Sequence, residues 1–226
     1  MTGLPHGRRR RLGLVLLTKA PAPGLAKRRL GGQIGAERAA QLARVLLGNT
    51  VDACLAFGAP VHGFHRGPAR QLPRHPRIDW QPSPGENPVS ATLAAFRDLS
   101  REYERLLAVP SDVPGLTRSY LAAADAALDH ADVALGPSSD GGLVLFGAAR
   151  ELPAGLGDVL SSSGRLYDDV LRCCTEHGLT VETLPRLTDV DTWWSLSHAI
   201  DQGELLEGSV LHAQLLDAVR ATSPLP

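Results

Sequence analysis

The chain has 226 residues, 43% hydrophobic and 21% charged, a composition typical of one full-sized globular domain with a buried core. Its formal net charge of −1 excludes a global attraction to nucleic acid or to an anionic membrane surface, so any anion site must be local. No apolar run approaches the roughly 18 residues that a bilayer span needs, and we predict a cytoplasmic protein without a membrane span.

The chain opens with a basic tail over residues 1–11, followed by an apolar run over residues 12–17. The run is too short for a secretory signal and lacks an A-x-A cleavage pattern, so we predict a strand buried on both faces. Residues 18–30, TKAPAPGLAKRRL, then form a loop rich in Gly, Pro and cations. A strand, such a loop and a helix present N–H groups, Lys and Arg to phosphate. The alternative is an ordinary surface loop whose cations face water.

The remaining pattern alternates strands and helices. Strands are predicted at residues 60–64, 78–80, 105–110, 132–136, 143–147 and 179–184, and helices at 36–55, 89–99, 117–130, 165–177, after 192 and at 204–220. The alternation predicts an α/β fold in one domain over residues 1–226, with a mostly parallel sheet and helices on both faces. The apolar stripe of the last helix could pack on the sheet or on a second copy of the chain. A homodimer is therefore one of two possibilities.

The cysteines and histidines give no sign of a disulfide framework or a zinc site. Three cysteines form no C-x-x-C pair, and we expect all of them to be small core residues. His62 and His65 are three residues apart without a third ligand nearby.

Asp112 follows directly on the apolar strand at residues 105–110. In open α/β sheets ligands bind at the carboxyl ends of the strands, so this carboxylate is well placed to hold a divalent cation that bridges phosphate oxygens. The alternative is a turn residue that caps the strand end before Pro114.

Two further acidic motifs follow. Asp140, Gly141 and Gly142 suit a tight hairpin turn, and they also let the backbone lie close to a sugar or base. Asp189 and Asp191 flank a valine before a helix, where one of them, or Thr192, could be the N-cap. In extended backbone, residues two apart point the same way, so both carboxylates could face one cation. Mg²⁺ (or Mn²⁺) usually needs only one or two carboxylates.

A cationic loop after the first strand and carboxylates at later strand ends are what phosphoryl-group chemistry needs. The chain has no G-x-x-x-x-G-K-[ST] or G-x-G-x-x-G motif, which argues against a kinase-like or a dinucleotide-binding protein. It also has no G-x-S-x-G elbow.

Four motifs in order, TKAPAPGLAKRRL, VPSDVPGL, LGPSSDGGLVLFG and LTDVDT, resemble the rSAM/selenodomain-associated transferase 1 family (DUF2064) from about residue 12 to residue 198. That family is similar to glycosyltransferases of the GT-A fold and to 2-phospholactate guanylyltransferase. The resemblance therefore implies a GT-A-like fold and a nucleotide-dependent transferase.

By position, the family's P-G-x-x-K-x-R-L element falls on Pro23, Gly24, Lys27, Arg29 and Leu30, with Lys19 upstream. Its strand-end aspartate falls on Asp112, its D-G-G on Asp140, Gly141 and Gly142, and its late D-x-D on Asp189 and Asp191. Residues 161–165, with Ser162 among them, take the place of its W-S-T-G-type segment, where a hydroxyl could meet the acceptor.

The chain departs from the family pattern at three places. Arg28 stands where Thr is usual, Leu143 and Val144 stand where aromatic residues are usual, and residues 85–90 replace an L-G-E-R-like stretch. The last two differences touch the expected acceptor and base pockets, so the substrate could differ from that of typical members.

The favoured function is nucleotidyl transfer from an NTP to a small phosphate-type acceptor. Lys27 and Arg29 would hold the triphosphate, and Asp112 with Asp191 or Asp189 would hold Mg²⁺. The loop at Glu86 and Asn87, with Gly141 and Gly142, would meet the base or the acceptor. One alternative is glycosyl transfer from a nucleotide-diphosphate sugar, with Asp140 as the acceptor base. The other is a nucleotide-binding domain without catalysis.

Overall fold

The computed structural model describes residues 10–153, 155–159, 165–204, 213 and 217. In this part of the chain seven strands form one sheet in the order β3-β2-β1-β4-β6-β5-β7. Neighbouring strands are parallel except at β6, which runs antiparallel to β4 and to β5. The strands are β1 (Arg10–Lys19), β2 (Val61–Arg66), β3 (Ile78–Pro82), β4 (Tyr103–Pro110), β5 (Val133–Pro137), β6 (Leu143–Ala148) and β7 (Val181–Thr183). The predicted mostly parallel α/β fold is confirmed.

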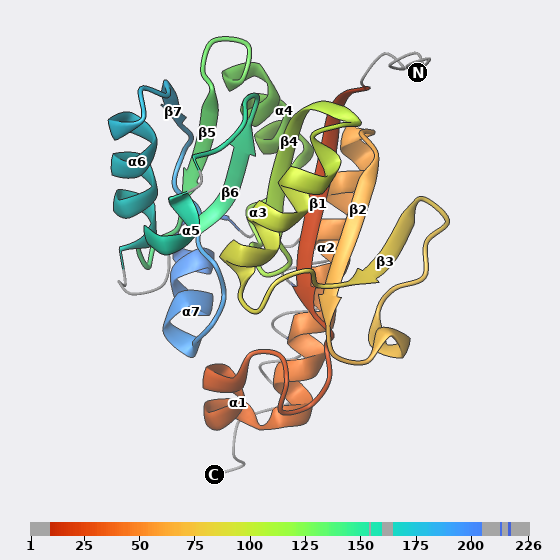
Figure 1. Cartoon of the computed structure of the whole chain (residues 1–226). Helices are drawn as coiled ribbons and strands as arrows, with labels where there is room; N and C mark the ends of the chain where they lie inside the picture. Colours follow the sequence, from red (N-terminus) through yellow and green to blue (C-terminus); the bar gives the residue numbers. More distant parts are fainter. Residues whose placement is uncertain (1–9, 154, 160–164, 205–212, 214–216, 218–226) are drawn as a thin grey trace.

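Helices cover both faces of the sheet, as Figure 1 shows. On one face lie α2 (Ala36–Phe57) and α4 (Arg118–Ala127), and on the other lie α3 (Pro88–Leu99), α5 (Leu156–Val159) and α6 (Leu166–Glu176). The short helices α1 (Arg28–Ile34) and α7 (Trp193–Asp201) pack together beyond the end of β1 and against α2. A 3₁₀ turn, η1 (Ala69–Gln71), lies between β2 and β3.

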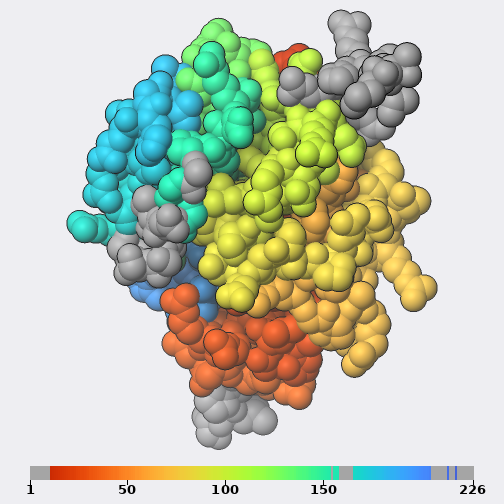
Figure 2. Space-filling view, in the orientation of Figure 1, coloured from red at the N-terminus to blue at the C-terminus, as the bar shows by residue number. Residues whose placement is uncertain are grey.

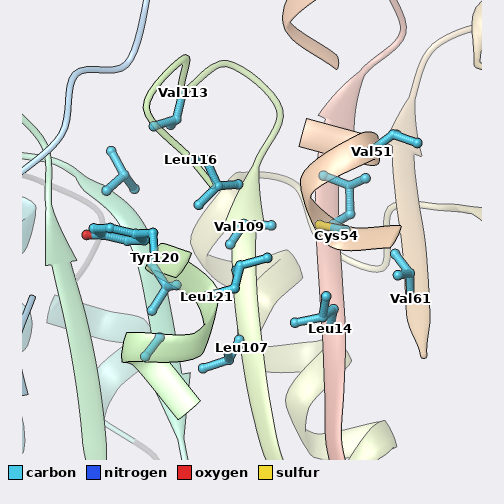
Figure 3. Packing of buried hydrophobic residues seen from close by; sticks show 14 of the residues in the cluster. Leu14, Val51, Cys54, Val61, Leu107, Val109, Val113, Leu116, Tyr120 and Leu121 are labelled. Carbon is cyan, nitrogen blue, oxygen red and sulfur yellow. The ribbon is translucent and has the colours of Figure 1, made fainter. Parts of the chain in front are cut away.

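The core on the α2 and α4 face is built from the apolar runs of the central strands (Figure 3). Leu14 of β1 and Leu107 of β4 are fully buried, and Cys54 of α2 and Leu121 of α4 pack over them. Burying a leucine side chain contributes about 1.5–3 kcal/mol. These contacts hold β1 and β4 beside each other.

The three cysteines are buried and unpaired, as expected. Burial raises the pKa of the Cys54 thiol to about 12. Each therefore behaves as a small core residue. Among the described residues, every helix is too short or too polar to cross a bilayer.

Two predicted boundaries at the N-terminal end are wrong. The helix α1 begins at Arg28, so the last residues of the predicted loop 18–30 are helical. Leu30 and Ile34 bury one side of this seven-residue helix, which is too short to show a periodic stripe. The strand β1 begins at Arg10, within the predicted tail, and Arg11 there donates to Asp125 at 3.2 Å. Of the predicted helix at 204–220, the described residues include only 204, 213 and 217.

Candidate functional site

The site lies where the strand order reverses. The chain leaves β1 to form β2 on one side of it, and later returns to place β4 on the other side. In parallel α/β sheets a crevice opens at such a switch point, beyond the carboxyl ends of the strands. The register pairs Leu17 with Pro110, so the residues that follow both strands meet. The hydroxyls of Thr18 and Ser111 lie 2.7 Å apart at this point.

Lys27 enters the crevice from the start of α1. Its ammonium donates to Asp112 Oδ2 at 2.5 Å and to Asp191 Oδ1 at 2.8 Å. Its side chain is only 6% exposed. Its backbone is left-handed (φ 51°), the only such case among the described non-glycine residues. The structure therefore joins three predicted site residues that are far apart in sequence.

The segment at residues 188–192 is fastened to the end of β4 by its backbone. The Val190 N–H donates to the carbonyl of Asp112 at 2.9 Å, and the Val190 side chain is fully buried between α1, α2 and α7. Thr188 donates to Glu204 through its N–H and its hydroxyl, at 2.9 and 2.7 Å. Thr192 is the N-cap of α7, in a capping box with Ser195. Of the three candidates for this cap, the structure therefore has Thr192, and neither aspartate caps the helix.

The two aspartates of this segment have different partners. Asp191 accepts from Lys27 and, at 2.8 Å, from Arg29, whose side chain is 71% exposed. Asp189 instead accepts a hydrogen bond from the Ser138 hydroxyl, at the start of the β5–β6 turn. Both aspartates line the same cavity.

The charges of the site depend on one another. Burial alone would lower the pKa of Lys27, but the attraction of Asp112 and Asp191 outweighs it and raises that pKa. Burial likewise works to raise the pKa of Asp191, yet Lys27 and Arg29 lower it. Lys27 and Asp191 are therefore both charged.

Asp189 differs from Asp191. Burial raises the pKa of Asp189 to about 6, against the opposing effect of its hydrogen bond from Ser138. The charges of Asp140, Asp112 and Asp191 raise it further. Carboxylates therefore gather at this end of the crevice. Among the described residues, no lysine or arginine forms an ion pair with Asp189.

The cavity has a volume of about 370 Å³, within the range of about 300–1,000 Å³ typical of small-ligand sites. Its wall runs from the loop after β1 to the start of α3 and the β5–β6 turn. In Figure 2 the α3 segment, in yellow, meets the α1–α2 segment, in orange-red, on this side of the molecule. The predicted site residues that line the cavity are Lys19, Lys27, Asn87, Asp112, Asp140, Gly142, Asp189 and Asp191.

Other predicted site residues lie outside the cavity wall. They are Pro23, Gly24, Arg29, Glu86 and Gly141. Among them Arg29 still contacts the site through Asp191. Ser162 lies outside the described residues.

Asn87 and Asp140 have local structural partners. Asn87 caps α3, where its side chain accepts from the Ser90 N–H at 2.9 Å. Asp140 accepts from the Gly142 N–H at 2.8 Å, inside the turn that joins the antiparallel strands β5 and β6. The predicted hairpin at the D-G-G motif is confirmed.

Six polar residues of the wall were not predicted as site residues: Thr18, Arg66, Ser83, Thr92, Ser111 and Ser138. Arg66 ends β2 and Ser83 follows β3, so the rule that ligands bind at the carboxyl ends of strands could have found both. Ser111 directly precedes Asp112. The contact of Ser138 with Asp189 joins residues 51 positions apart, which no local pattern predicts.

The donor set suits a hard divalent cation. Two carboxylates already converge on one cation, the Lys27 ammonium, and oxygen ligands are those that Mg²⁺ and Mn²⁺ prefer. Among the described residues, no group of three or more His, Cys, Asp or Glu could hold a metal alone. Mg²⁺ usually takes one or two carboxylates and completes its shell with water and phosphate, so Asp112 and Asp191 fit it.

Solved structures share this architecture and define a GT-A-like α/β fold. A crystal structure from Desulfovibrio desulfuricans G20, described as a "putative nucleotide-diphospho-sugar transferase", is 23% identical, with 95% of this chain and 99% of that chain covered and a TM-score of 0.82. Rv0371c of Mycobacterium tuberculosis H37Rv, in complex with manganese, is 14% identical, with 85% and 99% covered and a TM-score of 0.52. CMP:2-keto-3-deoxy-manno-octonic acid synthetase, complexed with CTP, is 10% identical, with 87% and 100% covered and a TM-score of 0.53.

The sequence comparison gives the family. The model of DUF2064, a family of uncharacterized proteins conserved in bacteria, matches residues 43–163, more than half of the chain. The chain belongs to this family, as its motifs predicted. No curated protein matches it.

Proposed function

We infer that the chain is a nucleotidyltransferase that depends on a divalent metal ion. It would join the NMP part of an NTP to a small phosphate- or phosphonate-type acceptor and release diphosphate. The observation that carries this proposal is the convergence of Lys27 and Arg29 with Asp112 and Asp191 beside one cavity at the strand ends. The shared fold of a CTP-bound synthetase and of a manganese complex supports it.

The reaction requires little acid–base chemistry. An acceptor oxygen attacks the α-phosphorus, a new O–P bond forms, and the bond from the α-phosphorus to the bridging oxygen breaks. The electron pair of that bond leaves with diphosphate. An anionic phosphate oxygen carries no proton to remove, so no general base is needed. This agrees with the cavity wall, because no histidine is part of it in the described residues.

The cations and the carboxylates of the site would have different roles, phosphate binding and metal binding. Lys27 and Lys19, with Arg29 at the edge, would neutralise and align the triphosphate. Asp112 and Asp191 would hold Mg²⁺ or Mn²⁺, which when bound stabilises negative charge on the phosphates and on the departing diphosphate. Asn87, at the start of α3, and Gly142, in the β5–β6 turn, stand where a base or an acceptor would contact the wall.

Glycosyl transfer from a nucleotide-diphosphate sugar is the second candidate. Asp140 favours it, because this carboxylate lines the cavity and could take a proton from an acceptor hydroxyl. The D. desulfuricans neighbour is described as a transferase of that class. Glycosyl transfer would release a nucleoside diphosphate instead of diphosphate.

Product analysis separates the two candidates. The wild-type chain is incubated with Mg²⁺ and each of the four NTPs plus phospho-acid acceptors, and in parallel with nucleotide sugars plus sugar acceptors. We expect acceptor-dependent diphosphate release. Release of nucleoside diphosphate from a nucleotide sugar, dependent on the sugar acceptor, would instead establish glycosyl transfer. Nucleotide binding without either product would mean a non-catalytic domain.

The Asp112→Asn variant tests the site. Loss of this charge should lower kcat/KM by about 100-fold or more, the size of effect seen when one preorganised electrostatic contact is removed. Asp52→Asn, an exposed position on α2 away from the cavity, is the matched control and should be unaffected. Undiminished activity of Asp112→Asn would remove Asp112 from the metal site.

A further inference from the structure

The position between the two carboxylates is filled by a side chain of the protein itself. The Lys27 ammonium lies 2.5 Å from Asp112 Oδ2 and 2.8 Å from Asp191 Oδ1. The exposed fractions of the two aspartate side chains are 25% and 33%, whereas that of Lys27 is 6%. The ammonium is thus the most deeply placed group of the three.

We propose that Lys27 competes with the divalent cation for Asp112 and Asp191, so that the chain takes up the metal together with a phosphate group and not alone. This inference rests on the proposed function, since it concerns how that site is loaded. It makes Lys27 a positioning residue for the metal as well as a contact for the nucleotide.

Geometry makes the two cations exclusive. Mg²⁺ requires ligand oxygens at about 2.1 Å. A divalent ion at that distance from Asp112 and Asp191 would lie against the ammonium that already contacts both, at a separation where like charges repel strongly. The lysine must therefore leave Asp112 Oδ2 and Asp191 Oδ1 before an ion can bind these two oxygens together.

Lys27 can leave only if it finds another anion. A buried charge that loses its partner is strongly unfavourable, so a metal ion arriving alone must overcome the loss of both contacts of Lys27. A phosphate group in the same cavity would accept the ammonium and remove that cost. Binding of metal and phosphate is then coupled, and the coupling is reciprocal.

The backbone of Lys27 has an unusual conformation where the chain enters α1. A lysine at φ 51° and ψ 46° has a backbone conformation that residues other than glycine rarely adopt. Its contacts with the two carboxylates offset this strain in the structure.

Manganese binding tests the competition directly. The full chain is titrated with Mn²⁺ alone, and the free ion is followed by its electron paramagnetic resonance signal. Lys27→Met should bind Mn²⁺ at least about 10-fold more tightly than wild type, a change of about 1.4 kcal/mol. Arg28→Met, an exposed neighbour on the same helix, is the matched control and should bind as wild type does. In Lys27→Met/Asp112→Asn the gain should disappear, which locates the new site at the carboxylates.

Two outcomes would overturn the proposal. One is equal Mn²⁺ affinity of Lys27→Met and wild type. The other is that wild type binds Mn²⁺ as tightly without a triphosphate as with one. Water-proton relaxation with each of the four Mn²⁺–NTP complexes measures this comparison. Thermal unfolding shows whether Lys27→Met folds, and Lys27→Gln, which keeps a hydrogen-bond donor, is the second variant.

The same data separate this inference from the proposed function. If no Mn²⁺–NTP complex binds wild type, the proposed function fails. The comparison of Lys27→Met with wild type in Mn²⁺ alone still decides whether lysine and metal compete.

Discussion

At the scale of single residues, the site is a balance of charges in which each group depends on its neighbours. Lys27 stays charged although it is buried, because two carboxylates face it. Asp191 is ionised because Lys27 and Arg29 lower its pKa. Asp189 accepts a hydrogen bond from the Ser138 hydroxyl and forms no ion pair among the described residues, and burial raises its pKa to about 6. The same residue type therefore has two ionisation behaviours two positions apart.

Asp189 should make stability depend on pH. Its pKa of about 6 in the folded chain is above the value of about 3.9 expected when unfolded, so its contribution to stability is fully present below about pH 4 and is lost as the pH rises through 6. Asp189→Asn mimics the neutral form. It should equal wild type near pH 4 and be more stable by about 3 kcal/mol at pH 7.5, as measured by urea unfolding. A difference that does not change with pH would contradict this explanation.

At the scale of elements, short turns and helix ends carry the wall of the cavity. The start of α3 depends on the capping box of Asn87 and Ser90, and Thr192 with Ser195 performs the same task for α7. The β5–β6 hairpin presents Ser138 and Asp140 to the cavity. Caps and turns thus hold in place the polar groups that the strands alone would not provide.

Variants of Asn87 separate capping from ligand contact. Asn87→Ala should lose about 1 kcal/mol of unfolding free energy because the cap is lost, whereas Asn87→Ser, also a good cap, should keep wild-type stability. If Asn87 also contacts the nucleotide, Asn87→Ser should raise KM severalfold while the thermal midpoint stays unchanged. An unchanged KM in Asn87→Ser would assign the residue to capping alone.

The sequence predicts most elements because their apolar patterns are long. The buried run of β1, the stripe of α2 and the D-G-G hairpin all follow from local residues. The helix α1 was missed because seven residues are too few for a periodic signal. The αL conformation of Lys27 was not predicted either, since lysine gives no local sign of it.

The candidate site was predictable only in part, for a similar reason. The rule for strand ends predicts that Asp112 lies near the basic loop, and the structure puts it beside Lys27. The choice between Asp189 and Asp191 could not be made, because their partners Ser138 and Lys27 are distant in sequence. Contacts across 51 and 164 positions depend on the whole sheet.

At the scale of the whole molecule, the site joins distant parts of the chain. The loop after β1, the end of β4 and the segment before α7 meet only when the sheet is complete, as the contact of Lys27 with Asp191 shows. The packing of α1 against α7 holds the two sides of the crevice together (Figure 1). Occupation of the site should therefore stabilise the entire fold.

Thermal unfolding measures this stabilisation. At a ligand concentration of about 100 Kd, binding adds about 2.7 kcal/mol, which for a chain of this size corresponds to about 5–10 °C in Tm. We expect this shift with Mg²⁺ and the preferred NTP. The matching nucleoside, which has no phosphate for the cations to bind, should shift Tm by much less. Equal shifts from both compounds would show that the base alone is bound.

A crystal structure with Mg²⁺ and a non-hydrolysable form of the preferred NTP would show where the phosphates, the metal ion and Lys27 lie when the site is loaded. We expect the phosphates in the crevice between β1 and β4, the metal ion on Asp112 and Asp191, and the Lys27 ammonium on a phosphate oxygen. A nucleotide bound elsewhere, or Lys27 still between the two carboxylates beside a bound triphosphate, would contradict it.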